Sequence, residues 1–126
     1  MYEKKIPKIF DCGLSVLMEV IGGKWKGYLL HLISHGMRRP NELQKEIKIA
    51  NRRALDLQLR ELEFHGLIHR VIHNELPPRV EYFLTDCGKS LLPVLEVMTQ
   101  WGDDYLDHYE ELFLKKDSIS SVIPAC

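Results

Sequence analysis

Hydrophobic residues recur at helical spacing at the start of the chain. The apolar positions of residues 12–21 are Leu14, Leu17, Met18 and Ile21. Side chains three and four residues apart line one face of a helix, and a glycine commonly follows a helix end. The pattern therefore predicts a short amphipathic helix from Cys12 to Ile21, interrupted by Gly22 and Gly23.

A second amphipathic helix is predicted from Lys24 to His35, before Gly36. The residues expected to share its apolar face are Trp25, Tyr28, Leu29, Leu32 and Ile33. The same spacing predicts that this helix packs one side against a core.

Two further helices follow. Residues 40–48 predict a short one, because Pro40 suits a first turn and Leu43 and Ile47 are four residues apart. Asn51 is a natural cap for a longer helix from Arg52 to His65, which Gly66 ends. The apolar face of the longer helix is Leu55, Leu59 and Leu62.

The pattern then changes from helix to strand. Residues 67–74 and 79–84 predict two strands, joined by a turn at residues 75–78 whose paired prolines cannot lie inside a sheet. Thr85 or Asp86 should cap a final helix that reaches about Leu114. We expect Pro93 to bend that helix.

This order of elements predicts a winged helix-turn-helix, in which two helices joined by a tight turn are followed by a β-hairpin. The fold class is α+β and mostly α. We expect an N-terminal arm over residues 1–11, one domain over residues 12–114 and a flexible tail over residues 115–126.

Charge is unevenly distributed along the chain, although the net charge is only −1. Residues 24–79 carry eleven basic and six acidic side chains, whereas residues 103–117 carry six acidic and two basic ones. A basic middle favours contact with a polyanion such as DNA. Mixed charge on an ordinary solvated surface explains the composition equally well.

The longer helix is the candidate recognition helix. Arg53, Leu57 and Arg60 lie on the side opposite its apolar face. Arginine can bond both acceptors of a guanine edge, and leucine can contact a thymine methyl group. A solvated face for the arginines, and a core or dimer contact for Leu57, are the alternatives.

Other basic and polar residues suit contacts with the DNA backbone, which add affinity but little sequence information. The candidates are Lys24, Lys26, Arg38, Arg39, Lys45, Asn51 and Arg52. Arg79, at the tip of the predicted hairpin, could contact a minor groove or a phosphate, or it could be a solvated turn residue.

The chain resembles the HxlR-type winged-helix regulators of bacteria, which are related to the MarR group. The resemblance covers residues 12–101 and is carried by four segments. They are IGGKWKGYLLHLISHG (21–36), RRPNELQKEI (38–47), LDLQLRELEFHGLIHR (55–70) and LPPRVEYFLTDCGKSLLPVL (76–95).

The resemblance implies a cytoplasmic homodimer that binds double-stranded DNA at a palindromic operator. It implies a dimer interface built from the first helix and the C-terminal helix, and it allows a small-molecule or redox effector. Pro40, Asp56 and Gln58 depart from the family pattern. An acidic Asp56 beside the groove would repel phosphate or accept from a cytosine amino group.

Three cysteines, Cys12, Cys87 and Cys126, match neither a disulfide framework nor a zinc site. Cys12 aligns with a cysteine that senses oxidants in some members of the family. Its place at a predicted helix start favours the thiolate, whereas the neighbouring Asp11 opposes it. A small apolar residue packed at a dimer interface is the alternative.

No phosphate-binding glycine loop, metal-ligand spacing or nucleophile–base pattern is present in the sequence. We therefore expect no enzyme, no metal and no cofactor. No apolar run is long enough to cross a membrane, and residues 1–11 lack a signal-peptide core, which predicts a cytoplasmic protein. The competing hypothesis is a winged-helix module that binds a protein instead of DNA.

Overall fold

The structure, a computed structural model, describes residues 10–114. The predicted arm and tail lie mostly outside this range, as does Cys126. The described residues form two compact units that divide between Leu92 and Pro93. Among them, no helix has the length and apolar character that crossing a bilayer requires.

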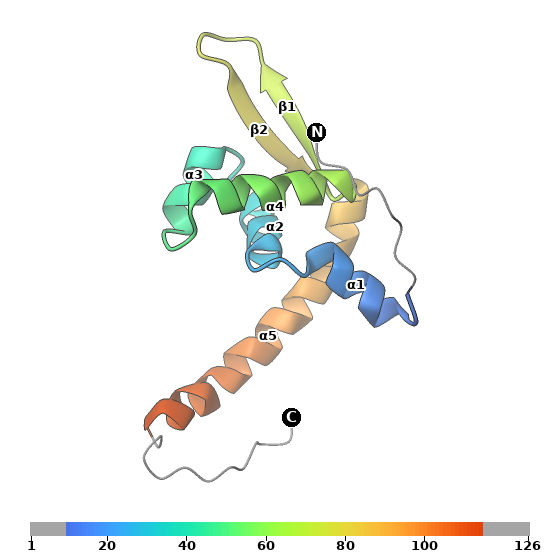
Figure 1. Ribbon diagram of the computed structural model, residues 1–126, viewed down its shortest axis with the longest axis vertical. Coiled ribbons are helices and arrows are strands. Elements are labelled where there is room, and N and C mark those ends of the chain that lie inside the picture. The colour runs from blue at the N-terminus through green and yellow to red at the C-terminus, as the bar shows by residue number, and fades with distance from the viewer. Residues whose placement is uncertain (1–9, 115–126) are drawn as a thin grey trace. The chain divides into compact units, whose positions relative to one another are not determined.

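The first unit contains four helices, a β-hairpin and the start of a fifth helix (Figure 1). The helices are α1 (Gly13–Ile21), α2 (Lys26–Ser34), α3 (Pro40–Glu46) and α4 (Arg52–Phe64). The strands are β1 (Ile68–His73) and β2 (Arg79–Leu84), and α5 runs over Asp86–Leu114. Each expected element is present, so the predicted winged helix-turn-helix is confirmed.

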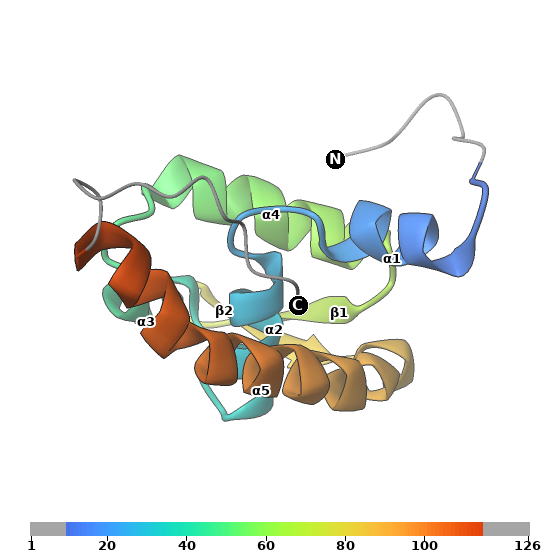
Figure 2. The same ribbon diagram turned by 90° about the horizontal axis from the view of Figure 1, so that it is seen from below.

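The core of this unit forms around α2, which contacts α4 on one side and β2 on the other (Figure 2). The side chains that are almost completely buried are Leu29, Leu30, Ile33, Leu43, Leu55, Leu59, Leu62 and Ile68. They come from α2, α3, α4 and β1, so the helix-turn-helix and the hairpin share one core.

Two glycines end helices in this unit. Gly36 and Gly66 have φ angles of +96° and +76°, which residues other than glycine rarely adopt. The residue after each glycine donates its N–H five residues back, Met37 to Leu32 and Leu67 to Leu62. These hydrogen bonds satisfy carbonyl groups at the helix ends.

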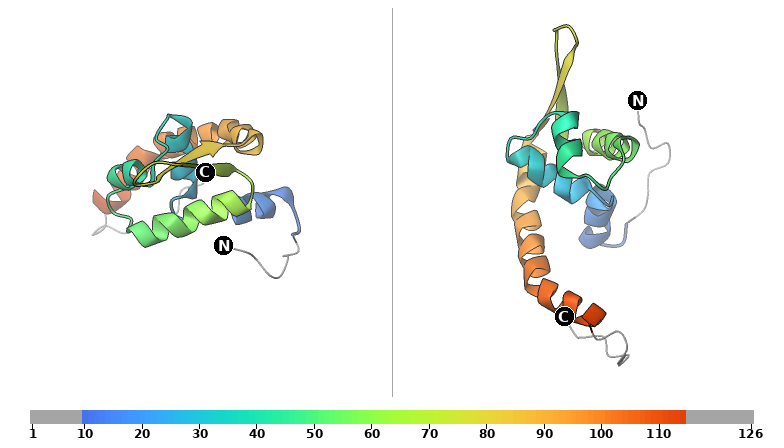
Figure 3. Two further views of the ribbon diagram at one scale, coloured as in Figure 1. Left: turned by 90° about the horizontal axis from the view of Figure 1, so that it is seen from above. Right: turned by 90° about the vertical axis from the view of Figure 1, so that its left-hand side faces the viewer.

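The hairpin is antiparallel, with Ile68 opposite Leu84 and His73 opposite Arg79. It extends away from α2, α3 and α4 (Figures 1 and 3). The N–H of Tyr82 donates to the carbonyl of Arg38 at 2.8 Å, which ties β2 to the segment before α3. The wing is therefore attached to the helix-turn-helix through the backbone of β2.

One sequence prediction about burial is wrong. Tyr28 is 44% exposed, and Leu30 takes a place in the core instead, because the buried face of α2 is wider than one stripe and turned toward Leu30. Leu14 and Met18 of α1 are 66% and 51% exposed. Of the α1 residues, only Ile21 is buried.

The second unit, where described, is the part of α5 from Pro93 onward. Pro93 lies inside the continuous helix. This segment leaves many large apolar side chains exposed. They include Val97, Met98, Trp101, Leu106, Tyr109, Leu112 and Phe113. Aromatic pairs lie along it, among them Trp101 with Tyr105 at 4.9 Å and Tyr109 with Phe113 at 5.0 Å between ring centres.

Candidate nucleic-acid interface

The two faces of α4 differ sharply, as the sequence predicted. Leu55, Leu59 and Leu62 are buried. On the opposite side Arg53, Leu57 and Arg60 are all exposed, Leu57 at 49% of its surface. Arginines flanking an exposed leucine provide hydrogen-bond donors beside an apolar contact, the combination that can recognise guanine and thymine edges in a major groove.

The start of α4 is fixed by polar contacts. The side chain of Asn51 accepts from the N–H of Ala54 at 2.7 Å, so the predicted cap is confirmed. Arg52 donates to Asn41 at 2.8 Å and to Asp56 at 3.1 Å. Arg52 thereby connects α3 to α4, and Asp56 has a cationic partner within its own helix.

The segment before α3 places two arginines differently. The carboxylate of Glu42 accepts from the N–H groups of Arg38 and Arg39, at 3.3 and 3.0 Å. The guanidinium of Arg38 lies over the ring of Phe83, 4.8 Å from its centre, and its side chain is half-buried. Arg39 is exposed, so its charge is accessible to a ligand.

The wing holds Arg79 between two carboxylates. Its guanidinium nitrogens lie 3.7 Å from Glu75 and 3.7 Å from Glu81. Glu81 also contacts His73 at 2.5 Å. Arg79 is the first residue of β2 and pairs with His73 next to the turn, so it lies at the turn end of the hairpin, as the sequence predicted.

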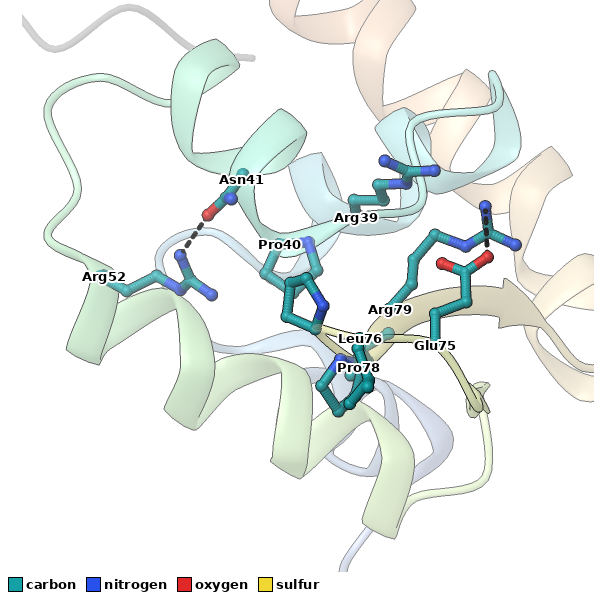
Figure 4. Close-up of a pocket in the computed structure, with 10 residues that line it drawn as sticks. Arg39, Pro40, Asn41, Arg52, Glu75, Leu76, Pro78 and Arg79 are labelled. Carbon is teal, nitrogen blue, oxygen red and sulfur yellow. Dashed lines mark hydrogen bonds and ion pairs between the residues drawn. The ribbon is translucent and has the colours of Figure 1, made fainter.

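A pocket of about 440 Å³ lies between the wing and the helix-turn-helix (Figure 4). One wall contains Arg39, Pro40, Asn41 and Arg52, and the other is residues 75–80 of the wing. The pocket thus brings together Arg39, Arg52 and Arg79, which lie in three separate segments of the sequence.

Lys26 is not positioned for the phosphate contact that the sequence predicted. Its side chain is 4% exposed, and Nζ lies 3.6 Å from Oε1 of Glu61 in α4. Nearby, the N–H of Trp25 donates to the side chain of Gln58 at 2.8 Å. The start of α2 packs against α4 here, so Lys26 connects two helices inside the protein.

Cys12 is exposed and precedes α1 as its capping residue. The N–H and then the hydroxyl of Ser15 lower the pKa of the Cys12 thiol below its usual value, and the N–H of Leu14 adds to the effect. Its Sγ is 3.6 Å from the Ser15 hydroxyl oxygen. Hydrogen bonds to the thiolate favour the reactive form.

Four residues that hold the arginines of this surface were not among the candidates from the sequence. They are Asn41, Glu42, Glu75 and Glu81. The acidic residue three positions after Arg39 was a usable signal for Glu42, because a Glu there commonly bonds the backbone at a helix start. No sequence signal joined Asn41 to Arg52, since their contact crosses the turn.

Comparison with known proteins identifies the family. The family model for the HxlR-like helix-turn-helix matches residues 20–110. The chain belongs to this family. The chain is also 45% identical over 100 residues to the HTH-type transcriptional regulator YkvN of Bacillus subtilis, covering 79% of this chain and 85% of that protein.

Similar proteins with solved structures are also regulators. The redox regulator HypR in its reduced form has a TM-score of 0.75 and 40% identity, covering 79% of this chain and 99% of that one. A regulator described as of the MarR family, from Enterococcus faecalis, has a TM-score of 0.66 and 37% identity, covering 79% and 90% of the two chains. This HxlR-family protein is a DNA-binding transcriptional regulator with a winged helix-turn-helix.

Proposed function

We propose that this regulator binds a palindromic operator as a homodimer, with α4 of each subunit in a major groove. The observation that carries the proposal is the exposed row of Arg53, Leu57 and Arg60 on the second helix of the helix-turn-helix. Arg38, Arg39, Asn51, Arg52 and Arg79 contact the DNA backbone or adjacent bases, and Asp56 orients Arg52. Lys26 is excluded because it is buried.

The dimer rests on the apolar surface of two helices. Leu14, Val16 and Met18 of α1 are exposed, as are Met98 and Trp101 of α5. Exposed apolar groups of this number mark a protein interface more often than a free surface. Two-fold symmetry then requires a palindromic site, because each subunit presents the same helix.

Binding to DNA from beside the protein's own gene tests the proposal, measured by fluorescence anisotropy at two salt concentrations. Arg53→Ala and Arg60→Ala should each weaken binding by about 1–3 kcal/mol, roughly 5- to 150-fold in Kd. Lys89→Ala, which removes an exposed charge at the start of α5, is the matched control. Binding that is indifferent to salt and to both arginines would favour the protein-interaction module instead.

Thiol control is a second proposed property. It is favoured by the exposed Cys12 with its lowered pKa, together with the likeness to the redox regulator HypR. Diamide should reduce DNA binding by the wild type and leave a Cys12→Ser variant unaffected. The same loss of binding in both proteins would assign the effect to another residue.

The remaining properties follow from this role. A regulator of transcription acts where the chromosome is, so we propose a cytoplasmic protein without catalytic activity. A small molecule is an alternative effector to an oxidant. Turnover of a substrate by the purified protein would contradict the assignment as a protein without catalytic activity.

A further inference from the structure

The pocket between the wing and the helix-turn-helix has charge at both ends and an apolar middle. In Figure 4 Arg52 and Asn41 lie at one end and Arg39 and Arg79 at the other, with Pro40 and Pro78 between them. Three arginines and a single acidic residue, Glu75, line the pocket. The pocket therefore suits an extended anion whose charges are separated by an apolar group.

A DNA strand has this chemistry, because each deoxyribose, which is uncharged and exposes mainly C–H groups, lies between two phosphates. We propose that the pocket holds one segment of the DNA backbone, and that the carboxylate of Glu75 is the internal anion that a DNA phosphate displaces from Arg79. The inference rests on the proposed DNA-binding function and adds to it a site and a residue that limits affinity.

Two observations favour a DNA strand over a small anion. The pocket adjoins Arg52, the first residue of α4, so it continues toward the row of residues proposed to enter the major groove. Its two walls both carry arginine, Arg79 on the wing and Arg39 and Arg52 on the helix-turn-helix. A strand can contact both walls at once.

Glu75 is suited to the role of a displaceable partner. Its side chain is 53% exposed and its carboxylate lies 3.7 Å from Arg79, so the pair is weak. Glu81, 22% exposed, continues to position Arg79 from within β2 when Glu75 leaves. A DNA phosphate can therefore replace Glu75 without disordering the arginine.

The test is a double-mutant cycle read by DNA binding at fixed salt. Glu75→Gln should tighten binding by roughly two- to fivefold, and this gain should vanish when Arg79 is already alanine. Glu63→Gln is the matched control, since Glu63 also pairs weakly with an arginine, Arg70 at 3.9 Å, outside the pocket. An equal gain with and without Arg79 would overturn the proposal.

A DNA-side readout locates the contact. Phosphates of the bound fragment are replaced one at a time by uncharged methylphosphonates. Replacing one particular phosphate in each half-site should weaken DNA binding by the wild type. The same replacement should not further weaken DNA binding by the Arg79→Ala variant. If no replacement couples to Arg79 while the α4 variants still lose binding, the pocket assignment fails and the proposed function stands.

A free anion is distinguished by titrating the protein with inorganic pyrophosphate. Saturable binding that is lost in Arg52→Ala, without any coupling between Arg79 and a DNA phosphate, would assign the pocket to a small anionic ligand and overturn the backbone assignment. Failure of the wild type to bind DNA at all would overturn both this inference and the proposed function.

Discussion

Lys26 shows how a charged residue can belong to the interior. Its aliphatic stem is enclosed where α2 begins, and its ammonium reaches Glu61, whose side chain is 19% exposed. The two partners are not equivalent, because Glu61 retains access to water when left alone and Lys26 does not. Removing the charge of Glu61 should therefore destabilise the protein more than removing the charge of Lys26.

We predict that Glu61→Gln lowers the free energy of unfolding by about 2–4 kcal/mol, since it leaves a buried ammonium without its counterion. Lys26→Met should cost less, because it keeps the packing of the stem and leaves only the partly exposed carboxylate. Urea denaturation measures both. Lys45→Ala, at an exposed lysine, is the control for stability.

The Lys26→Met variant also tests whether Lys26 takes part in DNA binding. Folded Lys26→Met should bind DNA with the wild-type salt dependence. A slope of log K against log salt reduced by about one would mean that Lys26 contacts a phosphate, contrary to its position in the structure.

At Cys12 the prediction concerns pH. Hydrogen bonds from Ser15 stabilise the Cys12 thiolate and lower the pKa of the thiol. The rate of Cys12 alkylation by iodoacetamide should therefore increase with pH, and its midpoint should lie at a lower pH in the folded protein than in the urea-unfolded chain. Ser15→Ala should move the midpoint upward and slow alkylation near pH 7. A Cys87→Ser/Cys126→Ser background isolates the signal, and identical midpoints in folded and unfolded protein would contradict the assignment.

Among the elements, the start of α5 is placed by close backbone contact. The N–H of Thr85 donates to the carbonyl of Leu67 at 3.0 Å, and its hydroxyl donates to Gly66 at 2.5 Å. The same hydroxyl accepts from the N–H of Gly88 at 3.0 Å. Thr85 thus caps α5 and anchors it to the turn between α4 and β1, as the sequence had partly predicted.

Gly88 permits this approach. A Cβ atom added there would lie 2.0 Å from the carbonyl oxygen of Leu67, which is backbone and cannot rotate away. We predict that Gly88→Ala destabilises the protein by about 2–4 kcal/mol despite the higher helix propensity of alanine. Thermal unfolding followed by circular dichroism measures it, and Lys89→Ala at the next, exposed position should be nearly neutral.

For the whole molecule, the exposed apolar residues of α5 predict self-association. Trp101, 52% exposed, lies on this surface, whereas its neighbour Gln100 hydrogen-bonds to Asp104 among polar residues. Trp101→Glu should shift the protein toward monomer in sedimentation velocity and weaken operator binding, because one subunit then contacts only one half-site. Gln100→Glu adds the same charge one residue away, and this variant should remain dimeric. If Trp101→Glu and Gln100→Glu weakened the dimer equally, the apolar surface of α5 would not be the dimer interface.

Local spacing was enough to predict the order of the elements. The helical period of Leu55, Leu59 and Leu62, the cap at Asn51 and the prolines before Arg79 act over a few residues, so their effect can be inferred from neighbours along the chain. The outward position of Arg53, Leu57 and Arg60 followed from the same period, because the opposite side of α4 had to be buried.

Only the tertiary structure decided which charges are available at the surface. Lys26 is enclosed because α4 supplies Glu61, and Arg52 is paired with Asn41 because the turn between α3 and α4 brings these two residues together. The pocket combines residues 39–41 and 52 with residues 75–80, segments whose proximity no local pattern encodes. The sequence by itself determined the elements and their faces, whereas burial and pairing depend on contacts between segments distant in the chain.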